Sequence, residues 1–535
     1  MAPLSDSYAA TGLLAIRTAA ILTILWLVQC ILRAIYNISP FHPCHQIPGP
    51  KLAASSYLYE FYFDFIKWGR YINEIQRMHE KYGPIVRINP DEVHCTDPNF
   101  IDEIYPVSGR KRNKPYWHVK NLVGPALTAG FSTQDHDLHR LRRVPLQKIF
   151  SKATIANLEP VIHDLAQQLC NKLLAQADSK RGSFDLTAAY SCYTSDVVAS
   201  YCFGESFGFL EQESFEPNFR RAVFSILNTR YFFKFFPWLK QLMKVEPYLR
   251  KYMPEDMTIL NKTLHVTIPR LVRQAQAEYE AGIVKAIPTV FDALYESDLP
   301  PEEKSVYRHT GEALILLSAG TETASWTLSV TTFHILNNPS ILSRLTAELE
   351  KAVSDPRKLP TWSTLENLPY LSAVINEGLR LSYGIVGRTS RVPVEEDLHY
   401  HGTWTPPLGS SSAPVTVSYI VPRGTAASMS SYITHHDEMI FPDSHEFLPD
   451  RWFDENGLWR KDLERCLLSF SKGSRQCLGM NLARCELTLA LAALVLRVLP
   501  RMHLHETTTK DVKFDFDLGV PMVEKGSKGV FVLVT

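Results

Sequence analysis

The feature that most constrains this chain is a cysteine between two glycines, just before an apolar helical run near the C-terminus. Residues 470–479 read FSKGSRQCLG, and the run Met480 to Leu499 follows. A cysteine there meets free backbone amides and the positive end of the helix macrodipole, which favour the thiolate that ligates metals. The glycines would let the backbone approach a flat, bulky group, and Arg475 offers a cation to an acidic substituent. The pattern therefore predicts a metal-bearing group at Cys477.

The remaining cysteines and the charge balance add little. Nine cysteines are scattered without paired spacing, which indicates a reducing compartment rather than a disulfide framework. Most are predicted to be buried thiols, including Cys466 and Cys485, which lack the flanking glycines and arginine. A buried structural thiol is also the alternative for Cys477. Lys and Arg total 56, as do Asp and Glu, so the charge gives no indication of a nucleic-acid partner, and we expect none.

A second segment places polar residues inside an apolar stretch. Residues 319–323 read AGTET inside the mainly apolar stretch Glu312 to Leu328, and such groups are costly there unless a cavity or cofactor uses them. The alternative is a Thr323 hydroxyl bonded back to its own helix, with Glu322 at an interface.

A possible ion-pair network lies downstream. Glu377 and Arg380 are three residues apart and would share one helix face. Arg451 could join them from a loop in a charge-assisted network. Taken alone, an exposed helical ion pair is the simpler interpretation of this spacing.

The N-terminus predicts a membrane anchor. Leu13 to Leu32 is apolar apart from Arg17 and is about long enough to span a bilayer, which takes roughly 20 residues. A cleaved signal peptide is the alternative, but no clear small-residue cleavage site follows. Ile47 to Pro50 would form a stiff spacer. We therefore expect an anchor over residues 1–40 and one catalytic domain over residues 41–535, with its bulk in the cytoplasm.

The periodicity of the chain predicts a mainly α fold with a small β region. Residues 135–380 carry long amphipathic helical patterns, and Ile85 to Ile88 follow a turn as a short strand. The stretch Val392 to Pro422 is rich in Pro, Gly, Ser and β-branched residues, which is typical of short strands and loops.

These motifs together resemble the cytochrome P450 family. Residues 470–479 match its haem-binding pattern FxxGxRxCxG at all fixed positions, including Phe470 and Gly479. The pair at 377 and 380 matches ExxR, residues 449–452 match PxRF with Trp in place of Phe, and residues 319–323 match AGx(D/E)T. The resemblance implies the P450 fold preceded by one N-terminal transmembrane helix. It is strongest to fungal secondary-metabolism P450s of the trichodiene-oxygenase-like group.

The resemblance also implies roles for individual residues. Cys477 would be the axial ligand of haem b (iron protoporphyrin IX), and Glu322 and Thr323 would deliver protons for dioxygen activation. A basic segment resembles the family's WxxxR helix with His instead of Trp. The haem carboxylates would be held by Arg475, Arg143, His139 and one of two arginines, Arg388 or Arg391, of which we favour Arg391.

The implied activity is insertion of one oxygen atom from dioxygen into a lipophilic terpenoid or polyketide-type substrate. Electrons would come from NADPH through a separate P450 reductase, on the endoplasmic reticulum membrane. A basic face of Arg140, Arg142, Lys148 and Lys472 could steer that donor. The alternatives are a haem-thiolate isomerase or dehydratase that works without dioxygen, and a non-catalytic haem-binding sensor.

The substrate pocket is expected to be apolar with few charges. By family resemblance its lining comes from residues 116–131, 316–323, 383–387 and 519–522. The side chains expected to dominate it are Trp117, Val123, Leu127, Phe131, Leu316, Ile385, Val386, Val520 and Met522.

Overall fold

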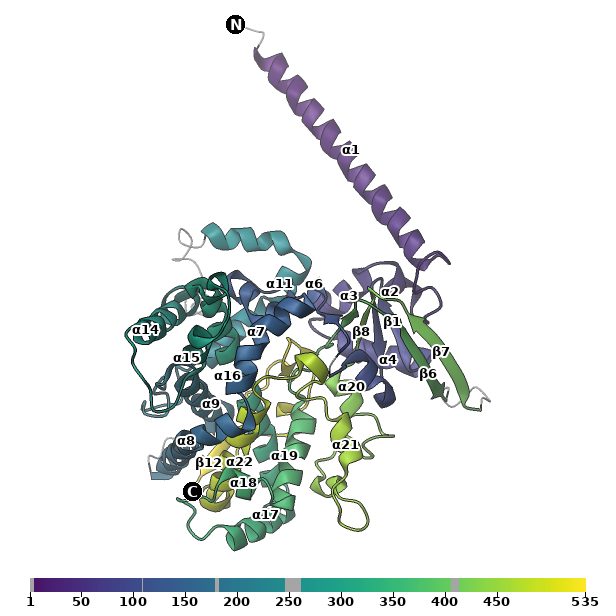
Figure 1. Ribbon diagram of the computed structural model, residues 1–535. Helices are drawn as coiled ribbons and strands as arrows, with labels where there is room; N and C mark the ends of the chain where they lie inside the picture. Colours follow the sequence, from purple (N-terminus) through teal and green to yellow (C-terminus); the bar gives the residue numbers. More distant parts are fainter. Residues whose placement is uncertain (1–3, 108, 179–181, 246–260, 406–412) are drawn as a thin grey trace.

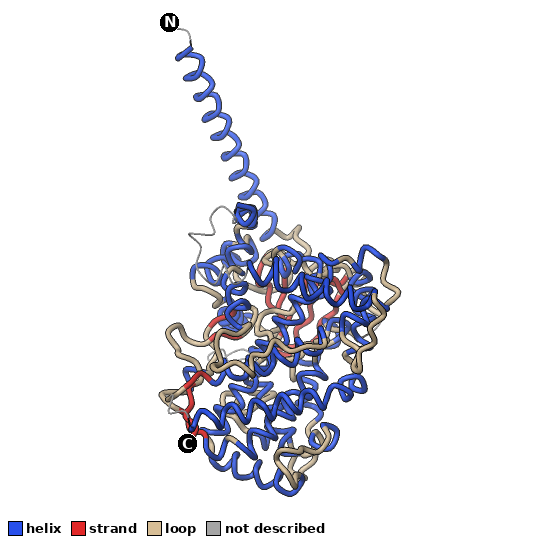
Figure 2. Tube along the Cα trace, turned by 90° about the vertical axis from the view of Figure 1, so that its left-hand side faces the viewer, coloured by secondary structure: helices blue, strands red, loops and turns tan. Residues whose placement is uncertain are grey.

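The computed structural model describes residues 4–107, 109–178, 182–245, 261–405 and 413–535. The described chain forms one helical body with small sheets at its periphery, and one helix stands apart from it (Figure 1). A view from the side shows most of the strands at the end of the body nearest that helix (Figure 2). The predicted fold class, mainly α with a small β region, is confirmed.

Long helices build the larger part of the body and its main hydrophobic core. The central helix α16 (Val306–Asn337) packs along α9 (Leu186–Phe203), and a Cβ at Gly320 would come within 2.5 Å of Val198. This glycine therefore allows the two helices to approach closely. The other long helices are α7 (His136–Ile149), α8 (Lys152–Asp178), α14 (Ile268–Glu280), α17 (Pro339–Ala352), α19 (Pro369–Ser382) and α22 (Met480–Arg497).

Shorter helices connect these elements. They are α2 (Lys51–Ser55), α3 (Leu58–Phe61), α4 (Tyr71–Tyr82), α5 (Ile101–Ile104), α6 (Tyr116–Val119), α10 (Arg220–Asn228), α11 (Arg230–Phe235), α15 (Val290–Glu296), α18 (Trp362–Leu365), α20 (Ser431–His435) and α21 (Lys461–Cys466). The helical prediction for residues 135–380 is thus confirmed over the described part of that stretch.

The strands form several small sheets. A three-stranded sheet has the order β1 (Ile85–Asn89), β2 (Glu92–Cys95), β8 (Ala426–Ser428), in which β2 and β8 are parallel. A second sheet joins β4 (Phe184–Asp185), β12 (Phe531–Val534) and β9 (Met502–Leu504). Three two-stranded pairs complete the set: β3 (Arg112–Asn113) with β5 (Val392–Pro393), β6 (Leu398–Trp404) with β7 (Val415–Val421), and β10 (Phe516–Asp517) with β11 (Pro521–Met522).

The N-terminal helix α1 (Leu4–Ile38) projects away from the body (Figure 1). Its Gly12–Ile38 portion is long and apolar enough to cross a membrane, and none of its most apolar window is buried against the protein. The helix is longer than the predicted stretch Leu13 to Leu32.

The segment that follows α1 differs from the predicted spacer. Asn37 is buried, donates from its amide to the Ser55 carbonyl, and accepts at its own carbonyl from Arg87. Ile47 is buried, the Arg87 amide donates to the Pro48 carbonyl, and Gly49 lies against β1 too closely for a Cβ. Ile47 to Pro50 is therefore docked on β1 rather than free between membrane and body.

Candidate active site

The loop before α22 has the geometry expected of a ligand-presenting turn. The Cys477 amide donates to the Phe470 carbonyl at 2.8 Å, which closes the loop, and α22 begins at Met480. Gly473 has a positive φ of 73°, and a Cβ there would lie 2.4 Å from the Tyr105 carbonyl oxygen. Gly473 thus serves the turn and its packing on the chain near residue 105, whereas a Cβ at Gly479 would meet open space. Of the two glycines, Gly479 is the one beside which a flat group has room.

The Cys477 side chain is open to solvent, unlike the buried Cys466 and Cys485. Protein packed around it raises the pKa of the thiol by desolvation, while the Gly479 amide and the Arg143 guanidinium act in the opposite direction. The groups that favour a thiolate therefore come from the loop before α22 and from α7.

Cationic side chains converge near this cysteine without acidic partners. Among the residues that the structure describes, no carboxylate forms an ion pair with Arg143, Arg391, Arg475 or Lys114. Burial and then the neighbouring cations, Arg475 foremost, lower the pKa of His139 to about 2. These surroundings disfavour the charged form of His139, and its neutral imidazole can still donate a hydrogen bond.

Two of these cations are buried on backbone oxygens. Arg475 donates to the carbonyls of Thr133 and Gln134 at 2.7 and 2.8 Å, and burial followed by the charge of Arg391 lowers its pKa to about 9. Arg391 donates to its own loop, at the carbonyls of residues 389 and 390, and its pKa is lowered by burial. A nearby negative group would relieve both shifts.

Arg388 already has acidic partners. It forms ion pairs with Glu60 and Glu92. The geometry therefore supports the preference for Arg391 over Arg388 at the predicted cofactor site, because Arg391 keeps its charge without an acidic partner.

The predicted charge network between α19 and the loop before residue 452 is present, and its Glu377–Arg380 pair is fully buried. Glu377 accepts from Arg380 at 2.7 and 3.0 Å and from Arg451 at 3.0 Å. The Trp452 indole N–H also donates to Glu377, at 3.1 Å. The tryptophan that departs from the expected phenylalanine thus supplies one more donor to a buried carboxylate, and the simpler interpretation of an exposed ion pair is wrong.

Comparison with known proteins decides the family. The profile of the cytochrome P450 family, described as "Cytochrome P450", matches residues 58–525. The chain belongs to the cytochrome P450 family.

Fungal monooxygenases are among the relatives of this P450. Cytochrome P450 monooxygenase ppzE of Metarhizium majus (strain ARSEF 297) is 41% identical over 85% of this chain and 95% of its own. Conidiogenone synthase PchP450 of Penicillium rubens is 37% identical over 93% of this chain and 96% of its own. Tryptophan 6-hydroxylase fscE of Fusarium equiseti is 36% identical over 96% of both chains. The P450 is accordingly a monooxygenase of the kind found in fungal secondary metabolism.

The residues of this P450 fit a haem-thiolate cofactor. The open thiol of Cys477 could ligate the haem iron, and the cations around it lack the carboxylates that would balance their charge. The Arg143 Nε is buried with no hydrogen-bond partner, which is costly unless a ligand supplies an acceptor. Haem carries two carboxylates, which would balance the positive charge and supply hydrogen-bond acceptors.

Helix α16 of this P450 holds Thr323 and Glu322 in the arrangement stated above as the alternative. The Thr323 hydroxyl donates to the Ala319 carbonyl at 2.7 Å. Glu322 is buried, 3.5 Å from the Arg220 guanidinium, which also bonds Asp185. Burial raises the pKa of Glu322, and Arg220 partly opposes this rise. Thr323 still has lone pairs that can accept, so proton delivery by this pair stays a prediction.

The predicted basic face of the P450 is only partly formed. Arg140 and Lys148 are exposed on α7. Arg142 is instead half-buried in an ion pair with Glu303 at 2.7 Å, so the prediction that it adds a free charge to this face is wrong. Lys472 is half-buried and donates to the Glu464 carbonyl.

The side chains predicted to line the substrate pocket fall into an exposed group and a buried group. Leu127, Phe131 and Ile385 are exposed, whereas Val123 and Val386 are buried, Val386 within a core cluster. A charged recess lies beside Trp117, and sequence reasoning missed it. Its residues come from segments far apart in the chain, so no local pattern could have indicated it.

Proposed function

We propose that this P450 is a membrane-anchored haem b monooxygenase that inserts one oxygen atom from dioxygen into a lipophilic terpenoid or polyketide-type substrate. Electrons would come from NADPH through NADPH-cytochrome P450 reductase. The observation that carries the proposal is the open thiol of Cys477 facing a group of buried cations that have no acidic partner. Such a charge imbalance is expected where an anionic cofactor is to be held.

Each residue would have a definite task. Haem, when bound, supplies the activation of dioxygen, with electron density contributed by a thiolate. Cys477 would hold the iron, and Arg143, Arg391 and Arg475 would orient the haem carboxylates. Glu322 would carry protons inward past Arg220, and Thr323 would pass them on after its hydroxyl turns away from Ala319.

The docking face for the reductase would be the groove next to the cysteine loop. This groove has a volume of about 400 Å³, and its lining includes Phe470, Met480, four cations and one acid, Glu464. Such a basic rim would attract an acidic flavoprotein to the side of the protein that carries the Cys477 loop. The cations are Lys461, Arg465, Lys472 and Arg484.

The substrate class rests on the exposed apolar side chains expected near the cofactor, Leu127, Phe131 and Ile385. Relatives whose names give a product or substrate include a conidiogenone synthase and a tryptophan 6-hydroxylase, so the named activities within this group differ. We propose that α1 spans the endoplasmic reticulum membrane once, with the catalytic body in the cytoplasm.

The test is turnover in microsomes that contain this protein and a P450 reductase, given NADPH, ¹⁸O-labelled dioxygen and a panel of terpenoid and polyketide precursors. Mass spectrometry should show one labelled oxygen in a product. Conversion that does not need NADPH would favour an isomerase. Intact haem with no conversion of any precursor would contradict the proposed substrate class and favour a binding protein.

A further inference from the structure

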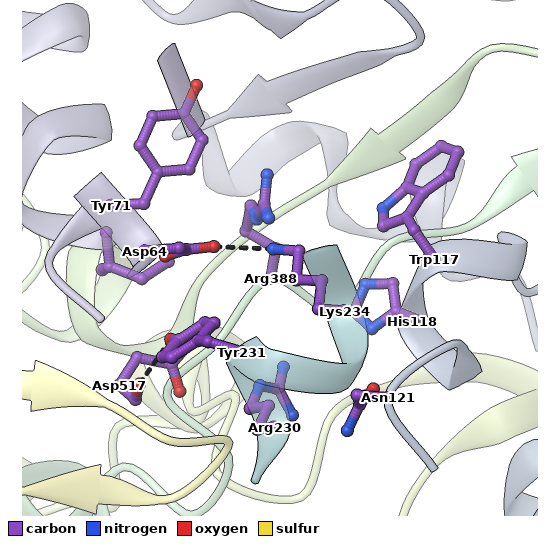
Figure 3. A pocket seen from close by; sticks show the side chains of 11 residues that line it. Asp64, Tyr71, Trp117, His118, Asn121, Arg230, Tyr231, Lys234, Arg388 and Asp517 are labelled. Carbon is purple, nitrogen blue, oxygen red and sulfur yellow. Dashed lines mark hydrogen bonds and ion pairs between the residues drawn. The ribbon is translucent and has the colours of Figure 1, made fainter. Parts of the chain in front are cut away.

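Segments that are far apart in the chain meet at a small polar recess (Figure 3). Asp64 lies after α3, Trp117 lies in α6 and Asn121 follows it, Arg230 begins α11, and Asp517 ends β10. The recess has a volume of about 20 Å³, which suits the end of a ligand and not a whole carbon skeleton.

Most charges around the recess are already paired. Lys234 bonds both Glu60 and Asp64, at 2.5 and 2.6 Å. Arg388 bonds Glu60 from the other side and Glu92 at 3.1 Å. These pairs form a buried, closed network, so neither cation is free to bind a ligand.

The donors left over are on the opposite side of the recess in the view of Figure 3, where Arg230 and Asn121 lie away from Asp64. Arg230 forms no ion pair with any described residue, and its Nε is buried without a hydrogen-bond partner. The Trp117 Nε1 is also buried without one. The carboxylates are better supplied, since Asp64 accepts from Lys234 and Asp517 accepts from the Gly519 amide. The buried Arg230 Nε and Trp117 Nε1 therefore lack an acceptor, although two carboxylates line other parts of the recess.

His118 connects this recess with the candidate haem site. Its Nε2 lies 3.0 Å from the Ser390 hydroxyl, directly before Arg391 in the chain. Burial lowers the pKa of His118 far below its usual value, and the charges of Lys114, Arg388, Arg230 and Arg391 act in the same direction. The His118 imidazole is thus close to cations of both the recess and the cofactor site, so the two sites are neighbours.

We propose that this recess binds a carboxylate of the substrate, with Arg230 as its main partner and Trp117 and Asn121 as further donors. The inference rests on the proposed monooxygenase function and adds a charged end to its lipophilic substrate. A guanidinium matches a carboxylate in a bidentate geometry, and the match is strong where water is excluded. A neutral hydroxyl would offer these donors a weaker hydrogen-bond acceptor than a carboxylate.

The test uses ligands whose imidazole binds haem iron and shifts its Soret absorption. The probes are imidazol-1-yl octanoic, decanoic and dodecanoic acids, each compared with its methyl ester in the full-length holoprotein. At one chain length we expect the acid to bind about tenfold more tightly than the ester, the ratio that a charge-assisted hydrogen bond gives. Arg230→Gln should abolish this ratio, and Arg230→Lys should keep part of it.

The control is Arg423→Gln, which removes an exposed arginine away from the recess and should leave the ratio unchanged. A thiolate-type ferrous carbon monoxide spectrum, recorded first, shows that each variant is folded and holds haem. If that spectrum is absent from the unmodified protein, the proposed function fails and the inference with it. If the spectrum is present but no chain length favours the acid, or Arg230→Gln keeps the preference, the carboxylate site alone is overturned.

Discussion

Cys477 is the residue whose replacement gives the most direct result. Cys477→Ala removes the open thiol in the loop before α22, so the thiolate-type ferrous carbon monoxide spectrum should be lost. Cys30→Ala, which changes an exposed cysteine of α1, should keep the spectrum. Retention of a thiolate-type spectrum by Cys477→Ala would show that another residue holds the iron.

Thr323 should affect the efficiency of turnover rather than binding. Thr323→Ala removes the hydroxyl that now bonds the Ala319 carbonyl, and we expect more peroxide and less product per NADPH. Thr323→Ser keeps a hydroxyl and should recover most of the coupling. Coupling that is the same in Thr323→Ala and the unmodified protein would exclude Thr323 from proton delivery.

Glu322 gives a prediction about pH. Burial raises its pKa and the charge of Arg220 lowers it, so Arg220→Gln should raise the pKa further. The pH at which coupling changes should then move upward in a profile of product formed per NADPH. Arg273→Gln, at an exposed arginine of α14, should leave the profile in place. An unchanged profile in Arg220→Gln would contradict a role for Glu322 in the relay.

At this scale the sequence predicts which residues matter better than it predicts what they touch. The motif around Cys477 indicates the ligand, because a cysteine flanked by glycines and arginine leaves few structural explanations. Gly473 and Arg142 were misjudged, since their partners, the Tyr105 carbonyl and Glu303, are distant in the chain. Arg230 carries no local signal at all and becomes notable through its lack of a partner.

Among the elements, the contact between α19 and the Trp452 turn can be tested through stability. Trp452→Phe removes a hydrogen bond to the buried Glu377 carboxylate and should lower the free energy of unfolding by about 2 kcal/mol. Trp459→Phe is the matched control, because that indole bonds a half-buried Glu464 at 3.3 Å and should cost less. Chemical denaturation of the two variants measures the difference, and equal losses would contradict the special role of Trp452.

Periodicity is sufficient to predict the helices and the strand β1, because long amphipathic patterns and turn residues are local signals. It cannot predict where an element docks. Ile47 to Pro50 has the composition of a spacer, yet the backbone of β1 offers hydrogen-bond partners that hold it in place. Similarly, Gly320 suggested a cavity from sequence, whereas the structure places it against Val198 of α9.

For the whole molecule, two truncations should separate anchoring from stability. A chain that lacks residues 1–34 loses most of α1 but keeps Asn37, and it should leave the membrane fraction with an unchanged unfolding midpoint. A chain that lacks residues 1–46 also loses the bonds of Asn37 to Ser55 and Arg87, and its midpoint should fall. Ultracentrifugation and denaturation measure these effects. Equal midpoints in the two chains would show that the docked segment adds no stability.

The bonds of Asn37 have a further consequence for motion. Because Asn37 in the last turn of α1 is hydrogen-bonded to Ser55 and Arg87, rotation of the catalytic body about the end of α1 should be restricted. With α1 spanning a membrane as proposed, helix and body should diffuse and rotate together, with the cysteine loop at a constant height above the lipid. An electron donor bound to the same membrane would then have to search in two dimensions only.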